Sequence, residues 1–373
     1  MNKVSEIGEK NWNKIANTKS PFLQYAFMDA LESCGCVGER QGWLSHHQVV
    51  EKDGEVVAIM PLYLKHNSYG ELVFDWSWAD AYARAGREYY PKFVSAIPYT
   101  PVTGARLCVS PGEDHKKIKP LMIEHLTLTA RQWSLSSVHC LFPEESDVSL
   151  FETQGYFLRL ACQFHWQNQN YESFDHFLSF MSSRKRKNIR RERSRVVEQD
   201  ISFQTLTGSQ VEDDLWPLIY DFYRKTFIEK GGYATFTLAF FKQIALTMGD
   251  QLLVTLAIHK GKYVAGAICY RDDTHLYGRH WGCFEEFHSL HFEACYYQGL
   301  DYAIEQGLAY FDPGAQGEHK IQRGFAPTAT WSAHWIKDED FSGVIGNFVR
   351  QEQVYMEEYI AEMTEKLPYK TKG

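Results

Sequence analysis

The hydrophobic positions of the chain change period several times, which predicts helices and strands in alternation. Apolar residues every three or four positions predict helices, and short apolar or alternating runs between turn residues predict strands. The first half is predicted to hold helices near 22–33 and 118–132 and strands at 47–50, 56–64, 138–141 and 157–166. The second half is predicted to hold helices at 174–181, 183–199, 215–228, 238–248, 290–306 and 344–366, and strands at 252–259, 264–271, 276–281, 309–312 and 328–336.

Two short patterns recur in the two halves of the chain. QGYFLRLACQFHW, which ends at Trp166, resembles RGFAPTATWSAHW, which ends at Trp335. Upstream, EKDGEVVAIMPLYL resembles IHKGKYVAGAICYR, with Gly54 matching Gly261. Because both matches occur in the same order, they indicate a duplicated α/β unit. We therefore expect an α/β fold (of the α+β type) with two tandem domains, 1–170 and 171–373, the second carrying the helix at 183–199 and a C-terminal helix.

The first copy is expected to carry an insertion, because the spacing between its two patterns is longer than in the second copy. The segment near 67–107 is rich in Tyr, Trp and Pro and is the candidate. A loop of this length inside a compact domain either has a function or packs over a neighbour. Within it, Asp75 and Trp76 are candidate substrate-binding residues.

Composition excludes several classes of protein. The 373 residues are 44% hydrophobic and 15% aromatic, which excludes a mostly disordered chain. No apolar run approaches the ~20 residues of a membrane helix, and the first residues lack the apolar core of a signal peptide, so we expect a cytoplasmic protein without a membrane span. The eight cysteines show no CxxC spacing and the histidines no HExxH, so we expect buried thiols and no metal site.

Charge is concentrated in one segment. The stretch RKRKNIRRERSR (184–195) holds eight basic residues and one acid, and the remainder has 31 basic and 46 acidic residues, a net −15. On a helical wheel, one face of this stretch carries a basic ridge opposite the apolar stripe. The ridge either binds an anion or is a solvated face paired with surface acids. Its candidate substrate-binding residues are Arg184, Lys187, Arg191 and Arg195.

Glu293 projects inside the apolar face of the helix predicted at 290–306, beside Tyr296. Burial disfavours the charged carboxylate and raises its pKa, which would suit Glu293 to act as a general base. The alternative is a structural glutamate held by Tyr, Arg or Lys within the core. Tyr296 is a further candidate for substrate binding.

The segment DPGAQGEHKIQRGF (312–325) follows a predicted strand and combines three glycines with charged side chains. Loops at the carboxyl ends of strands are where open α/β sheets usually bind ligands, although an ordinary glycine-rich connection is the alternative. Walker, GxSxG and strand-linked GxGxxG motifs are absent from the sequence, so NTP hydrolysis, serine hydrolysis and dinucleotide chemistry lose their usual signal. The candidate residues of this loop are Asp312, His319, Lys320 and Arg323.

The chain resembles the Fem-like family of bacterial N-acyltransferases, which is assigned to peptidoglycan biosynthesis or recognition within the GNAT superfamily. The resemblance runs from about residue 20 to 335 and implies two tandem GNAT-like domains, in agreement with the repeat. It rests on SSRKRKNIRRER, PLYLKHNSYGELVFDWSWADAYARAG, YYPKF, PYTPVTGARL, YGRHWG, LHFEACYYQGL and PGAQGEHKIQRGF.

The resemblance also implies two kinds of donor substrate and no permanently bound cofactor. Fem-type ligases use aminoacyl-tRNA and carry a Lys in an FK-x-x-FG pattern; here Lys320 takes that position, after His319 and before Gly324-Phe325. GNAT enzymes bind acyl-CoA through a Q/R-x-x-G-x-G/A loop at a helix start, and the stretch from Arg279 to Gly282 matches its first half. Acyl-CoA and aminoacyl-tRNA are therefore both candidate donors.

These features together predict an N-acyltransferase. It would pass an acyl or aminoacyl group to a primary amine, of a small molecule or a nucleotide-linked cell-wall precursor, in a cleft between the two domains. Glu293 would be the base, and Lys320 and Arg323 would stabilise the oxyanion. The alternative is a non-catalytic protein whose basic ridge recognises a phosphorylated glycan precursor or RNA.

The basic ridge is expected to bind a polyanion. Charge reversal in Lys187→Glu with Arg191→Glu should reduce affinity for CoA, tRNA or a nucleotide-sugar and flatten its salt dependence, measured between about 50 and about 200 mM salt. Lys185 and Arg190 lie off the ridge and are the controls. Unchanged affinity in a folded double variant would contradict the prediction.

Overall fold

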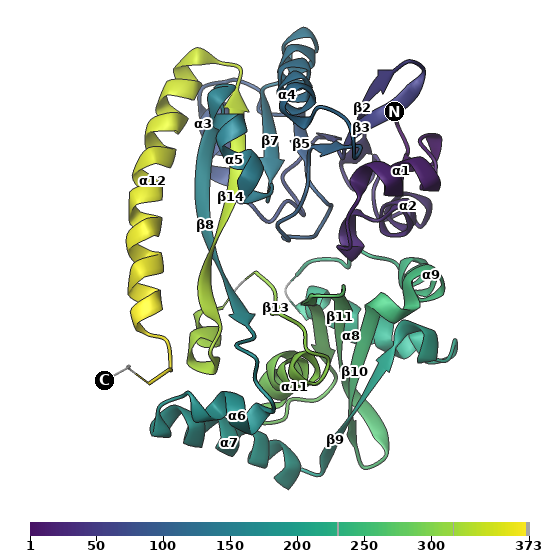
Figure 1. Ribbon diagram of the computed structural model, residues 1–373, viewed down its shortest axis with the longest axis vertical. Helices are drawn as coiled ribbons and strands as arrows, with labels where there is room; N and C mark the ends of the chain where they lie inside the picture. Colours follow the sequence, from purple (N-terminus) through teal and green to yellow (C-terminus); the bar gives the residue numbers. More distant parts are fainter. Residues whose placement is uncertain (230, 316, 371–373) are drawn as a thin grey trace. The chain divides into compact units, whose positions relative to one another are not determined.

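The predicted alternation of helices and strands is present in the computed structural model, which describes residues 1–229, 231–315 and 317–370 (Figure 1). The chain divides into two units, and two chain segments contribute to each. The first unit holds residues 1–161 and 329–358, and the second holds 162–328 and the chain from 359 onward. Among the described residues, no helix is both long and apolar enough to cross a membrane.

The main sheet of the first unit has the strand order β1-β4-β5-β7-β14. Its neighbouring strands are antiparallel, except that β5 and β7 are parallel. A smaller antiparallel sheet has the order β2-β3-β6. The elements are α1 (Glu9–Ala16), α2 (Tyr25–Ser33), β1 (Trp43–Ser45), β2 (Gln48–Lys52), β3 (Glu55–Met60), β4 (Tyr63–Lys65), α3 (Trp76–Arg84), β5 (Lys92–Ser95), β6 (Cys108–Val109), α4 (His115–Gln132), β7 (Ser137–Leu141), α5 (Glu145–Thr153), β14 (Ala326–Ile336) and α12 (Glu339–Glu365).

The sheet of the second unit has the order β8-β13-β12-β11-β10-β9. Here too one neighbouring pair is parallel, β12 with β13, and the others are antiparallel. The elements are β8 (Phe157–Gln167), α6 (Phe174–Ser179), α7 (Ser183–Glu198), β9 (Ile201–Thr207), α8 (Trp216–Glu229), α9 (Leu238–Met248), β10 (Leu252–His259), β11 (Lys262–Arg271), β12 (His275–Cys283), α10 (Leu290–Phe292), the π-helix η5 (Glu293–Tyr297), α11 (Gln298–Glu305), β13 (Tyr310–Asp312) and the 3₁₀-helix η6 (Glu318–Arg323).

The predicted duplication is confirmed by matching irregularities in the two units. Strands β8 and β14 coincide with the repeated pattern and have the same length of 11 residues. The hairpins β2–β3 and β10–β11 both turn through a residue pair with positive φ, Asp53-Gly54 and Lys260-Gly261. Each hairpin also has a register shift at the matching position, Val50/Glu51 and Ala257/Ile258. The expected α/β class with a duplicated unit therefore holds.

The predicted insertion at 67–107 is not a loop added to the fold. It contains helix α3 and strand β5, and β5 pairs with β4 on one side and β7 on the other. Strand β5 is therefore the counterpart of β12, since each is the first member of a parallel pair. Its four residues are all buried and do not alternate between apolar and polar, which is why periodicity did not reveal it.

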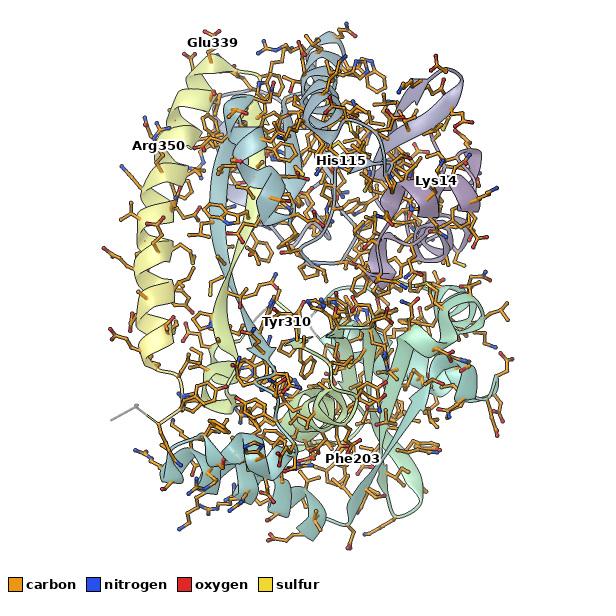
Figure 2. The ribbon with its side chains drawn as sticks, viewed as in Figure 1. Lys14, His115, Phe203, Tyr310, Glu339 and Arg350 are labelled. Atoms are coloured by element: carbon orange, nitrogen blue, oxygen red, sulfur yellow. The ribbon has the colours of Figure 1, made fainter. Side chains whose placement is uncertain are left out.

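Helix α12 has one apolar face and one polar face. Ile345 and Val349 are buried against Trp78 and Tyr82 of α3. Glu339 and Arg350 lie on the opposite side and point away from the sheet (Figure 2). The apolar residues therefore recur with helical spacing on the face that packs within the first unit.

Two glycines allow helices to pack tightly on strands β12 and β13. A Cβ on Gly282 of β12 would lie 1.8 Å from the carbonyl oxygen of Phe222 in α8. A Cβ on Gly299 of α11 would lie 2.5 Å from the ring of Phe311 in β13. No larger residue fits at either position, so these glycines set the distance of α8 and α11 from the parallel strand pair.

Gly282→Ala should destabilise the second unit, because its methyl group would overlap a backbone carbonyl that cannot turn away. We expect a loss of about 3 kcal/mol, the upper end for overpacking, in urea unfolding.

Gly343→Ala in α12 is the control, since its Cβ would meet nothing within 4 Å. It should leave stability unchanged or raise it by about 0.5 kcal/mol through helix propensity. Equal stability of the two variants would show that the contact at Gly282 relaxes freely.

Candidate active site

A polar cluster lies at the end of strand β13 in the second unit. Asp312, the last residue of β13, is 4% exposed and pairs with Arg279, whose Nη2 lies 2.5 Å from Oδ2. Its other oxygen accepts the backbone N–H of Gly314 at 2.8 Å and lies 3.7 Å from Nε2 of His165 in β8. Although burial opposes this, Arg279 and His165 lower the pKa of Asp312 to about 2. Asp312 is therefore a fixed anion that orders the start of the loop.

Arg279 occupies a β-bulge. Ile268 of β11 faces His280 and Cys269 faces Gly278, so Arg279 is the extra residue on β12. A bulge turns the side chain away from the regular alternation of the strand. The place of Arg279 in this cluster could not be predicted from the sequence, because a β-bulge depends on pairing with β11 and has no local sequence pattern here.

The half-match of Arg279–Gly282 to a pyrophosphate-binding loop does not coincide with such a loop in the structure. These residues lie within strand β12 and not at the start of a helix. Gly282 is explained by the packing of α8, and the exposed carboxylates that follow the strand, Glu285 and Glu286, would repel a phosphate.

Lys320 is the buried cation of the cluster. It lies in η6, is 1% exposed, and donates to the carbonyl oxygen of Gly314. Burial lowers the pKa of Lys320 to about 8, which Asp312 only partly opposes. The ammonium group is therefore buried and still mostly charged near pH 7, and it loses its charge at a lower pH than an exposed lysine. The predicted loop also includes Gln316, which lies outside the described residues.

The other two candidates on η6 are engaged by side chains from helices. Exposed His319 contacts the hydroxyl of buried Tyr296 at 2.8 Å. Arg323 donates two bonds of 2.9 Å to the carboxylate of Glu192 and lies over the ring of Phe292. Arg323 thereby ties η6 to helix α7 and to the helical segment around η5.

Glu293 is the first residue of the π-helix η5 and is 4% exposed. One of its oxygens accepts Nη2 of Arg193 at 3.0 Å and Nε2 of Gln298 at 2.8 Å. The other oxygen has no hydrogen-bond partner among the described residues. Burial raises the pKa of Glu293, with Arg193 opposing. π-Helices often mark functional sites, and the arrangement fits both sequence interpretations of Glu293, base or structural carboxylate.

The basic ridge faces away from the core of the second unit. Arg184, Lys187 and Arg191 are exposed, whereas Ile189 and Val196 on the opposite face are buried. Arg195, the last residue of the ridge, is half-buried and contacts Nε2 of His288 at 3.0 Å. Of the two control positions, Arg190 is already paired with Asp175 at 2.8 Å.

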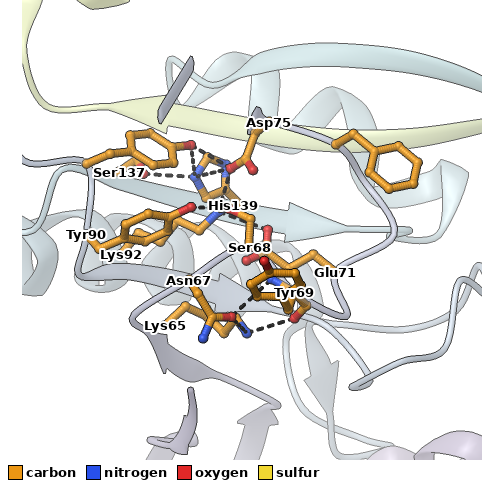
Figure 3. A network of polar contacts seen from close by, with 12 residues as sticks. Lys65, Asn67, Ser68, Tyr69, Glu71, Asp75, Tyr90, Lys92, Ser137 and His139 are labelled. Atoms are coloured by element: carbon orange, nitrogen blue, oxygen red, sulfur yellow. Dashed lines mark hydrogen bonds and ion pairs between the residues drawn. The ribbon is translucent and has the colours of Figure 1, made fainter. Parts of the chain in front are cut away.

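A second polar cluster lies in the first unit (Figure 3). Lys92 of β5 is fully buried, and its Nζ lies 2.5 Å from Asp75, 2.9 Å from Glu71 and 3.0 Å from Ser68. Tyr89 donates to the same oxygen of Asp75 at 2.6 Å. Lys92 and His139 hold the pKa of Asp75 well below its usual range despite its burial, whereas burial raises the pKa of Glu71 to about 7.

Asp75 and Trp76 begin helix α3 but point in different directions. Asp75 occupies the N-cap position, yet its side chain makes no capping bond, because it is directed at Lys92. Omitting such a cap costs about 1 kcal/mol. Trp76 is 40% exposed and its ring contacts that of Tyr69 at 5.0 Å. Of the buried cluster, only Asp75 was predicted from the sequence; Glu71, Lys92 and His139 were not.

The two clusters occupy equivalent positions of the duplicated fold. In the first unit His334 of β14 faces His139 of β7, and their Nδ1 atoms are 2.6 Å apart. In the second unit His165, the repeat partner of His334, lies beside Asp312 of β13. Burial lowers the pKa of His334 to about 3 and that of His139 far below its usual range. In the first unit a buried histidine pair thus lies near Lys92. In the second unit half-buried His165 and buried Asp312 lie next to Arg279.

Nearly the whole chain is similar to one known protein family. Residues 3–371 match the FemAB-like family, described as peptidoglycan biosynthesis/recognition. No curated protein sequence matches the chain.

Two solved structures show the fold, and a third is a weaker likeness. The C-terminal domain of a putative lysylphosphatidylglycerol synthetase from Agrobacterium fabrum has a TM-score of 0.55 at 10% identity, covering 94% of this chain and 97% of that one. The structure of L-PGS from Bacillus licheniformis gives 0.53 at 11%, covering 86% and 95%. A tandem GNAT protein from the clavulanic acid biosynthesis pathway gives 0.47 at 11%, covering 89% and 95%. The two-unit α/β fold implied by the sequence agrees with the first two likenesses. Because the family match spans nearly the whole chain, the protein belongs to the FemAB-like family.

Proposed function

We propose that the protein is an N-acyltransferase that passes an acyl or aminoacyl group to a primary amine, with the reaction in the second unit. The observation that carries this proposal is Lys320. It is a buried cation whose ammonium donates to a backbone carbonyl, that of Gly314, and it pairs with no carboxylate among the described residues. Such a cation is available to stabilise the negative oxygen that forms when an amine attacks an acyl carbon.

The surroundings of Lys320 support this role. Gly314, Gly317 and Gly324 all have positive φ, so the backbone of the loop turns sharply and presents no side chain at these points. Arg323 holds η6 through Glu192 and through the carbonyl oxygen of His319, to which it donates at 2.8 Å. In the proposal Arg323 fixes the position of Lys320 and adds positive charge to the loop.

Glu293 is the proposed base that accepts the proton of the attacking amine. Arg193 and Gln298 hold one carboxylate oxygen, and the second is unpartnered among the described residues. A carboxylate fixed by one oxygen and free at the other can take a proton without rearrangement. Tyr296 and His319, joined by a hydrogen bond, would contact the substrate from the same helix and loop.

An aminoacyl donor is favoured over acyl-CoA. Strand β12 contains the residues that resembled a pyrophosphate loop, and Glu285 and Glu286 follow it. The basic ridge offers phosphate contacts on α7 instead, as a tRNA would require. The structure with a TM-score of 0.55 is named for a putative synthetase of lysylphosphatidylglycerol, a lipid that carries an aminoacyl group. The acceptor is proposed to be an amine of a cell-wall precursor, in keeping with the family description.

Lys320→Ala should depress amide formation strongly, by about 10²-fold for the loss of one oxyanion donor. The assay offers aminoacyl-tRNA and acyl-CoA separately with primary amines and detects the amide by mass spectrometry. Lys225→Ala is the matched control, since Lys225 also donates to a backbone carbonyl, that of Phe284, at 2.9 Å. Absence of turnover with either donor, combined with retained tRNA binding, would favour the non-catalytic alternative.

The titration of Lys320 should make the proposed activity depend on pH. Lys320 stabilises the oxyanion only when charged, and its pKa is about 8. The ratio of wild-type to Lys320→Arg activity should therefore fall as the pH rises through about 8, because arginine keeps its charge. A ratio that rises with pH would identify neutral Lys320 as a base.

Glu293→Gln separates its two interpretations. The amide keeps the shape and most of the hydrogen bonds but cannot accept the proton, so turnover should fall about 10²-fold with little change in melting temperature. A large loss of melting temperature with normal turnover of the folded fraction would show a structural carboxylate.

A further inference from the structure

The first-unit cluster contains two buried carboxylate oxygens without partners. Oε1 of Glu71 and Oδ1 of Asp75 make no hydrogen bond with any described residue, although the two side chains are only 3% and 1% exposed. Their other oxygens are taken by Lys92, whose third bond goes to Ser68. Buried polar atoms are rarely left without a partner. Since an ionised carboxylate only accepts hydrogen bonds, the missing partner is a donor.

The charges of the cluster indicate that this donor is a cation. Glu71 and Asp75 carry two negative charges when ionised, and Lys92 balances one of them. Lys65 is the other nearby cation, but it bonds to the carbonyl oxygen of Tyr69 at 3.0 Å and to Asn67 at 3.4 Å rather than to either carboxylate. Burial lowers the pKa of Lys65 to about 7 and raises that of Glu71 to about 7. Without a ligand, a proton on Glu71 thus supplies the charge that the cluster lacks.

Aromatic rings face the cation that the cluster already contains, Lys92. Nζ of Lys92 lies 5.1 Å from the ring centre of Tyr89 and 5.7 Å from that of Tyr90. Ring faces attract ammonium groups, most strongly where water is excluded. A divalent metal ion is disfavoured relative to a singly charged ammonium, because Lys92 already contacts both carboxylates and repels a doubly charged ion about twice as strongly.

We propose that the first unit binds a primary ammonium group of the acceptor substrate, which donates to the free oxygens of Glu71 and Asp75. This assignment rests on the proposed transfer to an amine. The ammonium held here serves to recognise the acceptor and is a different group from the amine that Glu293 would deprotonate in the second unit. The segment between Lys65 and α3 supplies both carboxylates on its buried side. On its exposed side it carries Tyr69 and Trp76, 63% and 40% exposed, whose paired rings would contact the stem that bears the ammonium.

Binding must then displace the proton of Glu71. The charged groups that face Glu71 are Lys92 on β5, Asp75 before α3 and Lys65 on β4, and His139 on β7 faces Asp75. A bound ammonium replaces the proton as the balancing charge, so binding near pH 7 should release part of a proton from the protein. The alkylamine itself stays protonated at this pH, because its pKa lies about as high as that of lysine.

Isothermal titration of the full chain with pentylamine tests the assignment, with 1-pentanol as the uncharged analogue. Titration in two buffers of different ionisation enthalpy measures the proton released. We expect binding of the amine and not of the alcohol, with proton release that is larger at pH 6.5 than at pH 8. No amine binding at about 50 mM, well above an affinity of about 1 mM, or equal binding of the alcohol, would overturn the proposal.

Glu71→Gln is the decisive variant. Glutamine resembles the protonated Glu71 of the unliganded cluster, so this variant should fold, as circular dichroism can verify. Its affinity for pentylamine should fall at least about tenfold and the proton release should vanish.

Asp147→Asn is the matched control. Asp147 is also a buried carboxylate of the first unit that pairs with a lysine, Lys119 at 2.6 Å, and has one unpartnered oxygen. Unchanged affinity in Glu71→Gln, or an equal loss in Asp147→Asn, would contradict the assignment. These binding measurements do not depend on turnover. A protein that binds pentylamine as described but transfers no acyl group would contradict the proposed function and not this assignment.

Discussion

The parallel pairing of β12 with β13 is the constraint on which the chemistry of the second unit depends. This pairing places Tyr277 opposite Asp312, at the point where β13 ends. Two residues further along β12, the bulge presents Arg279 to the same carboxylate. Asp312 in turn holds the amide of Gly314, whose carbonyl holds Lys320. A shift of one residue in the register would turn Asp312 to the other face of the sheet and break every later link.

The first unit uses the same plan for different chemistry. Its parallel pair, β5 with β7, supplies Lys92 and His139 in place of Arg279 and Asp312. Here the carboxylates come from the irregular segment before α3. Because side chains in this segment need not alternate between two faces as they do in a strand, both carboxylates can point to Lys92. Burying these ions is costly unless each is paired, and one N-cap bond of α3 is given up to keep Asp75 on Lys92. Duplication therefore preserved the position of a polar cluster and changed its ions.

Features made by residues close together in sequence were predictable, and features made by residues far apart in sequence were not. The duplication was predicted because turns and bulges are local and left matching residues in both copies. The loop at 312–325 was predicted because its glycines and charges are contiguous. The first-unit cluster was largely missed, since Lys92 and His139 lie in strands of four and five buried residues and meet Asp75 only in the folded unit. A lysine inside YYPKF and a histidine inside SVHCL were the available signals, because such residues are rarely buried without partners.

The discontinuity of the units has a consequence for synthesis of the chain. His139 and His334, which meet in the first unit, are 195 residues apart in sequence. The ribosome therefore releases β7 long before β14 exists, and its edge stays open while the whole second repeat is made. Strand β8, of the same length as β14 and related in sequence, emerges in the meantime and is an available wrong neighbour. Strand β14 can therefore pair with β7 only after the second repeat has been made, and pairings over such a sequence separation are slow to form and leave a strand edge exposed until they do.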